Sequence, residues 1–142
     1  MELTTSEKIR LIVKMQGRTL SEVASKNGIT HGAFSIKLDT NYWIEPEIEE
    51  LANVLNINYY FGFDYDNFKQ NNNLTVTQQI KQILKDKGIR QVELAEKLGV
   101  TKSTLSTNLK RDKWSEPYLK RIGEALNVKP CVVFILQDGT EI

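Results

Sequence analysis

Residues 91–106 read QVELAEKLGVTKSTLS, a pattern that predicts two short helices joined by a tight turn. Apolar residues recur at helical spacing up to Gly99, and glycine suits the left-handed position that commonly ends a helix. Thr101 follows as a hydroxyl cap for the next helix, in which we expect Leu105 and Leu109 to be buried. The stretch therefore predicts a helix, a glycine turn and a second helix whose N-terminal residues face outward.

The same pattern occurs a second time in the chain, 71 positions earlier. A shift of 71 residues aligns residues 3–71 with residues 74–142 without a gap, and 19 of the 69 pairs are identical. Trp43 with Trp114 is one of these pairs, and we expect both indoles to pack in a core. We interpret the chain as two copies of one unit, residues 1–68 and 74–142, joined by the polar linker 69–73.

Each copy predicts four helices followed by a short strand. The fourth helix of each copy carries a proline in its first turn, and the apolar period then changes from 3.6 to 2. We expect strands at 59–65 and 131–136, with pairing between them as one arrangement, and a hairpin from Asp138-Gly139 through Ile142. The predicted fold class is mainly α, with two tandem domains of about four helices each.

The stretch 91–106 closely resembles the phage-repressor-like (XRE, Cro-like) helix-turn-helix family. The resemblance covers nearly all of residues 74–142. Residues 3–66 keep the same pattern of helices, but their residues at the DNA-facing positions diverge from the family. It implies double-stranded DNA as partner, with base-edge contacts from Lys102, Ser103, Thr104, Thr107 and Asn108 and phosphate contacts from Gln91, Lys110, Arg111 and Lys113. Side chains of these types can donate to or accept from base edges, and the cations release counterions from phosphates.

The first copy lacks most of these side chains. Leu20 stands where the family has glutamine, and the equivalent helix begins with His31-Gly32-Ala33. His31 and Lys37 are its weaker candidates for DNA contact. Residues 1–70 hold 7 basic and 10 acidic side chains, a net −3, whereas residues 71–142 hold 12 and 8, a net +4. A phosphate backbone should attract the second copy and repel parts of the first.

Composition excludes several classes of protein. The chain has 142 residues, and no stretch approaches the roughly 20 apolar residues of a membrane span. Its one cysteine and one histidine lie 100 residues apart, too few and too distant for a disulfide, a zinc site or a nucleophile with its base. We therefore expect no enzymatic activity, no cofactor or metal, no membrane partner, and a cytoplasmic location.

The predicted function is a sequence-specific transcriptional regulator, a repressor of a phage or mobile element bound to its operator. Three roles for the first copy remain open: a second DNA contact, a homodimer contact, or a contact with a host or phage protein. The alternative function is a protein-interaction or inhibitor module, anti-CRISPR-like or antitoxin-like, using the acidic segment 39–50 and the strands. Its interaction candidates are Tyr59, Phe61, Phe63, Cys131, Val133 and Ile135, although Cys131, within an apolar run, is expected to be a buried small hydrophobe.

Overall fold

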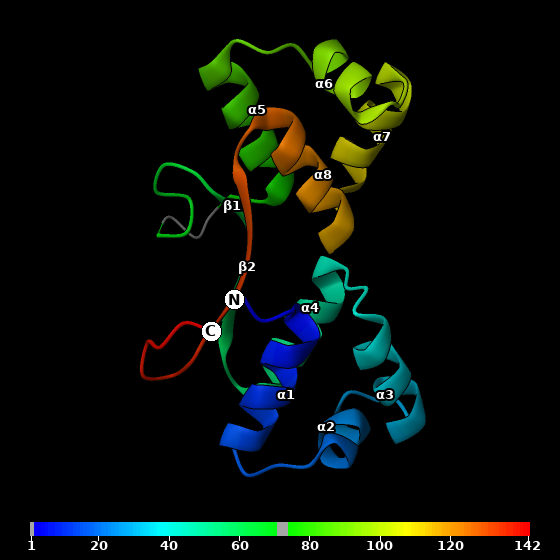
Figure 1. Cartoon of the computed structure of the whole chain (residues 1–142), viewed down its shortest axis with the longest axis vertical. Helices are drawn as coiled ribbons and strands as arrows, with labels where there is room; N and C mark the ends of the chain where they lie inside the picture. The colour runs from blue at the N-terminus through cyan, green and yellow to red at the C-terminus, as the bar shows by residue number, and fades with distance from the viewer. Residues whose placement is uncertain (1, 71–73) are drawn as a thin grey trace. The chain divides into compact units, whose positions relative to one another are not determined.

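The computed structural model describes residues 2–70 and 74–142, which form eight helices and two strands (Figure 1). The predicted mainly helical class is confirmed. Lys69 and Gln70 of the predicted linker lie in a turn, and its remaining residues, 71–73, lie outside the described residues. Two compact units are present: the first unit is Met1–Tyr59 with Val133–Ile142, and the second unit is Tyr60–Val132.

The first unit contains the helices α1 (Thr5–Met15), α2 (Leu20–Lys26), α3 (His31–Thr40) and α4 (Glu45–Leu55). Threonine hydroxyls cap the first three helices, as helix N-termini favour. Pro46 lies in the first turn of α4, as predicted. The core is formed by apolar side chains from all four helices and by the indole that follows α3: Ile9, Ile12, Val23, Phe34, Leu38, Trp43, Ile48, Leu51 and Leu55.

The second unit repeats this order with α5 (Val76–Lys87), α6 (Gln91–Leu98), α7 (Lys102–Arg111) and α8 (Glu116–Leu126). A shift of 71 residues superimposes the bounds of α3 and α4 on those of α7 and α8. Trp114 is 1% exposed, like Trp43, so the prediction that both indoles pack in a core is confirmed.

The strands β1 (Asn58–Asp64) and β2 (Lys129–Ile135) pair as a two-stranded antiparallel sheet, the pairing that the sequence analysis proposed. After β2 the chain turns back at Gly139, and Ile135 forms an antiparallel bridge with Glu141, which confirms the predicted hairpin.

The predicted alternation of β1 is wrong, because residues 60–63 are all buried. Tyr60, predicted to lie on the opposite face from its neighbours, is buried because its hydroxyl donates to the Phe63 carbonyl at 2.6 Å and lies 3.0 Å from Gln79 Oε1. Gln79 comes from α5 and also accepts the Phe63 N–H at 3.0 Å. A polar side chain of α5 thus provides hydrogen-bond partners for the buried Tyr60 hydroxyl and the buried Phe63 N–H.

Among the residues that the structure describes, no helix has both the length and the hydropathy to cross a bilayer.

Candidate nucleic-acid interface

The turn between α6 and α7 sets the direction in which α7 leaves the core. Gly99 ends α6 with a φ of 71°, a left-handed conformation that glycine adopts without a steric penalty. The Val100 N–H then donates to the Ala95 carbonyl at 3.0 Å, and Thr101 Oγ1 accepts the Thr104 N–H at 3.0 Å. The turn is closed by backbone bonds on one side and by a helix cap on the other.

A buried polar cluster fixes the far end of α7. Asp112 ends the helix in the left-handed region, with a φ of 50°. Its Oδ1 accepts hydrogen bonds from the Thr77 hydroxyl at 2.7 Å and from Trp114 Nε1 at 3.0 Å. Thr77 belongs to the first turn of α5, and its hydroxyl also lies 2.8 Å from the Leu109 carbonyl. The last turn of α7 is thereby attached to the start of α5 as well as packed through Leu109.

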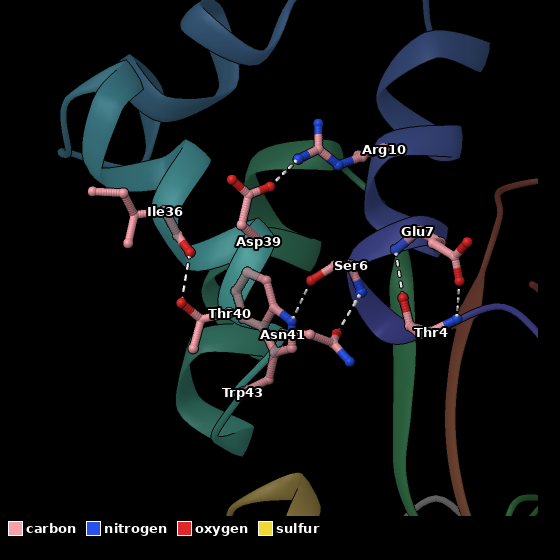
Figure 2. Close-up of polar contacts among 9 residues, drawn as sticks. All are labelled: Thr4, Ser6, Glu7, Arg10, Ile36, Asp39, Thr40, Asn41 and Trp43. Atoms are coloured by element: carbon pink, nitrogen blue, oxygen red, sulfur yellow. Dashed lines mark hydrogen bonds and ion pairs between the residues drawn. The ribbon is translucent and has the colours of Figure 1, made fainter.

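An equivalent cluster holds α3 in the first unit, as Figure 2 shows. The Ser6 N–H donates to Asn41 Oδ1 at 3.0 Å, and Trp43 Nε1 donates to Ser6 Oγ at 3.0 Å. These three residues are 71 positions before Thr77, Asp112 and Trp114. This cluster was not predicted from the sequence, although a hydroxyl, a turn-forming Asn or Asp and a tryptophan at matching positions of both copies would have indicated it.

Five of the predicted contact residues form one outward face of α7, opposite the buried Leu105 and Leu109. The outward face of α7 consists of Ser103, Thr104, Thr107, Lys110 and Arg111, all of them exposed, and Lys102, also exposed, is the first residue of the helix. Lys113, also exposed, lies in the loop that follows. Within residues 2–70 and 74–142, none of these four cations forms an ion pair. Unpaired cations beside hydroxyl groups are able to bind phosphates and base edges together.

The other two predicted contact residues are less accessible. Gln91 is the first residue of α6 and is half-buried. Asn108 is also half-buried, and its Nδ2 donates to the Tyr118 hydroxyl at 3.0 Å. The Tyr118 ring meets Trp114 edge-on, with ring centres 5.5 Å apart. Asn108 is therefore turned toward α8, a contact that no local motif marks because the two residues belong to different helices.

Arginine side chains near α6 complete the basic surroundings. Arg121 of α8 donates to the Leu98 carbonyl at 2.6 Å and so fastens α8 to the end of α6. Arg90, the residue before α6, is bound to Glu93 at 3.1 Å. The Arg90 N–H and then its guanidinium hold the pKa of Glu93 below its usual value. The family pattern did not point to Arg90, whose side chain is 78% exposed.

The two weaker DNA candidates of the first unit differ in accessibility. His31 is exposed at the first residue of α3. Lys37 is half-buried, its Nζ lies 2.9 Å from Glu47 Oε2, and it lies 5.3 Å from the centre of the Trp43 ring. Lys37 stays a weaker candidate for DNA contact, and its charge is paired with Glu47 within the unit.

The predicted interaction residues of the strands differ in burial. Phe61 is 3% exposed and Phe63 is fully buried, so both belong to a core and offer no surface to a partner. Cys131, expected to be buried, is half-buried, as are Tyr59, Val133 and Ile135. Burial, with Glu45 and Glu49 nearby, raises the pKa of Tyr59 to about 12.

The division into two units makes the difference in charge larger than the sequence halves indicate. The first unit holds 6 basic and 10 acidic residues, a net −4, and the second unit holds 13 and 8, a net +5. A polyanion is therefore attracted to the unit that carries the exposed cations of α7.

The α6, turn and α7 arrangement, supported on α5 and α8, defines a helix-turn-helix domain of the kind that binds DNA. Residues 80–133 match the family model described as Helix-turn-helix, of the XRE/Cro-like type. The match supports a DNA-binding regulator. Comparison with curated proteins and with solved structures finds no match. In the described part of the chain, no group of three His, Cys, Asp or Glu side chains is placed to hold a metal ion.

Proposed function

We propose that this chain is a sequence-specific regulator that binds double-stranded DNA through its second unit. The observation that carries the proposal is the outward face of α7, where unpaired cations and hydroxyl groups share one exposed helix surface. A helix of this kind fits the major groove, where every base pair presents a distinct set of donors and acceptors.

The residues of α7 divide into two chemical roles under this proposal. Lys102, Ser103, Thr104 and Thr107, near the start of the helix, face base edges. Lys110, Arg111 and Lys113, near its end, face phosphates. The phosphate contacts supply affinity and position, whereas the base contacts supply sequence preference.

We further propose that binding represses transcription of a phage or mobile-element gene. The support for this is the phage-repressor-like family of the second unit. A small protein that occupies an operator beside a promoter blocks polymerase without contacting it.

The test is a fluorescence titration of the full chain against duplexes from the region upstream of its own gene, at two salt concentrations. We expect a subset of duplexes to bind tightly in the presence of random competitor DNA. Their log affinity should fall by about 0.9 per phosphate contact for each tenfold rise in salt. Negligible binding at both concentrations would contradict the proposal.

A second candidate function, an inhibitor or antitoxin-like module that binds another protein, is favoured by the surface of the first unit. In the described residues, every large apolar side chain that is exposed belongs to that unit: Leu3, Leu11, Met15, Ile29, Ile36 and Tyr42. Exposed apolar side chains of this kind are available for a protein contact. This candidate predicts that a partner protein is bound with no DNA binding in the titration above.

A further inference from the structure

The surface of α3 that faces away from the core is apolar at its centre. Ile36 is 69% exposed, the most exposed large apolar side chain among the described residues. Ile29, just before α3, is 38% exposed, and Tyr42, just after it, is 47% exposed. Figure 2 shows the Ile36 side chain pointing away from Trp43 and α1.

The outward face of α3 consists of Gly32, Ala33, Ile36, Asp39 and Thr40, all exposed. The equivalent positions of α7 hold Ser103, Thr104, Thr107, Lys110 and Arg111. Every residue of the α7 face that is able to bind DNA is thus replaced by one that is smaller, apolar, acidic or uncharged. A DNA contact of the α7 kind is lost from α3, while the helix itself is kept.

The polar groups on the outward face of α3 are already satisfied within the unit. Arg10 lies 3.0 Å from Asp39 Oδ1, and the Thr40 hydroxyl donates to the Ile36 carbonyl at 2.8 Å (Figure 2). The face therefore carries no uncompensated charge. Two identical copies of this face bring no unpaired charge into the contact, although each first unit has a net charge of −4. A strongly basic partner would find the Asp39 carboxylate already paired.

Nothing within the first unit requires a glycine at position 32. Its φ is not positive, and a Cβ at this position would meet nothing within 4 Å. Glycine weakens a helix relative to alanine, so an unneeded glycine in α3 costs stability. A missing side chain here leaves room for an atom that comes from outside the unit.

We propose that the outward face of α3 binds the same face of a second copy of the chain. Gly32 and Ile36 lie one helical turn apart on this face, so an antiparallel pair of α3 helices places each Ile36 against Gly32 and Ala33 of the other copy. A protruding side chain and an empty position on the same face make it self-complementary. The resulting dimer carries two α7 helices, the number that a two-fold symmetric DNA site requires.

The dimer forms without DNA, so its test is independent of the proposed function. Sedimentation equilibrium of the full chain, whose mass is 16.3 kDa, should give twice that mass at micromolar concentration. Ile36→Lys and Gly32→Leu should each weaken the dimer by about tenfold or more, because one inserts a charge and the other fills the empty position. Gly32→Leu has open space within the unit, so its thermal midpoint should not fall at a concentration where the chain is monomeric.

The matched control is Met15→Lys, which places the same charge on a 56% exposed apolar site of α1 and should leave the dimer unchanged. A wild-type chain that stays monomeric, or that dimerises as tightly in both α3 variants, would overturn the proposal. So would a monomer whose DNA affinity depends on Ile36, because the face would then contact DNA. Lys110→Glu with Arg111→Glu should abolish DNA binding and leave the dimer mass unchanged, which separates the two proposals.

Discussion

Asp112 illustrates how one side chain sets the position of a whole helix. Its Oδ1 joins the end of α7 to Thr77 and Trp114, and its backbone takes a left-handed conformation that Asn and Asp tolerate better than most residues. In the first unit Asn41 occupies the equivalent position, with a φ of 53°. At the end of this helix the second unit therefore uses a carboxylate oxygen as the hydrogen-bond acceptor, and the first unit uses an amide oxygen.

Substitution of Asp112 tests this role. Asp112→Ala should lower the free energy of unfolding by about 1–3 kcal/mol, because Thr77 and Trp114 lose a buried acceptor. Asp112→Asn keeps the acceptor that Asn41 supplies in the first unit, so it should cost less. Urea unfolding measures both. Equal losses in the two variants would show that the hydrogen bonds do not hold α7.

The base-facing residues of α7 are tested by giving that helix the side chains of α3. The triple change Ser103→Gly, Thr104→Ala and Thr107→Ile should remove most discrimination between a specific duplex and random DNA, since it deletes hydroxyl groups and no cation. The salt dependence of binding should stay, because Lys110 and Arg111 remain. Competition titration measures the ratio of the affinity for the specific duplex to the affinity for random DNA. An unchanged ratio would show that other residues recognise the bases.

Most of the exposed residues of α7 were predictable from the sequence, because their exposure follows from the helical period once Leu105 and Leu109 are assigned to the core. It did not predict the contacts of Asn108 and Lys37. Both depend on a side chain of the following helix, Tyr118 and Glu47, and only the packing of the two helices brings these groups together.

The helices were predictable as elements because their ends depend on nearby residues. Threonine caps, glycine stops and prolines in first turns act within a few positions, and α6 ends at Leu98, just before the stop predicted at Gly99. Strand β1 was less predictable. Its burial on both faces depends on Gln79, which is distant in sequence and reaches the strand from α5.

Gly62 in β1 is explained by that same side chain. A Cβ on Gly62 would overlap the Gln79 amide and come within 2.8 Å of the Tyr60 hydroxyl. Gly62→Ala should therefore destabilise the protein by about 1–3 kcal/mol in urea unfolding. Adding Gln79→Ala removes the overlapping atoms, so the double variant should lose less than the sum of the single losses. Additive losses would contradict this explanation.

The two tyrosines at positions 59 and 60 of β1 lead us to expect a lower free energy of unfolding at alkaline pH. Burial raises the pKa of Tyr60 above its ordinary 10.0, and burial raises the pKa of Tyr59 to about 12. Both phenols stay neutral in the folded chain when those of the unfolded chain ionise. Their contribution is complete below pH 10.0 and is lost as the pH rises above it.

Urea unfolding at a series of pH values measures this effect. The free energy of unfolding should fall above about pH 10, and the fall should be shallower in Tyr60→Phe, which cannot ionise. Tyr60→Phe should be less stable than wild type at neutral pH, because it loses the bond to the Phe63 carbonyl. The same slope in both proteins would show that Tyr60 is not the group responsible.

For the whole molecule, the net charge of +1 conceals two units of opposite sign, −4 and +5. The sequence halves already indicated the division. Pairing of β1 with β2 places the C-terminal residues 133–142 in the first unit, which the linear order of the chain does not reveal. We retain as a proposal that the units are tandem copies, one of which kept a DNA-binding face while the other exchanged it for an apolar one.

The proposal that the second unit alone supplies the DNA contacts is tested most directly by the affinity of paired variants for one specific duplex. Lys110→Glu with Arg111→Glu should abolish specific binding at moderate salt, because it replaces two phosphate-binding cations with anions. Lys85→Glu with Lys87→Glu, the same charge change on two exposed lysines of α5, controls for net charge and should reduce affinity far less. His31→Ala with Lys37→Ala should leave binding nearly unchanged. Equal losses from the α3 and α7 variants would contradict the claim.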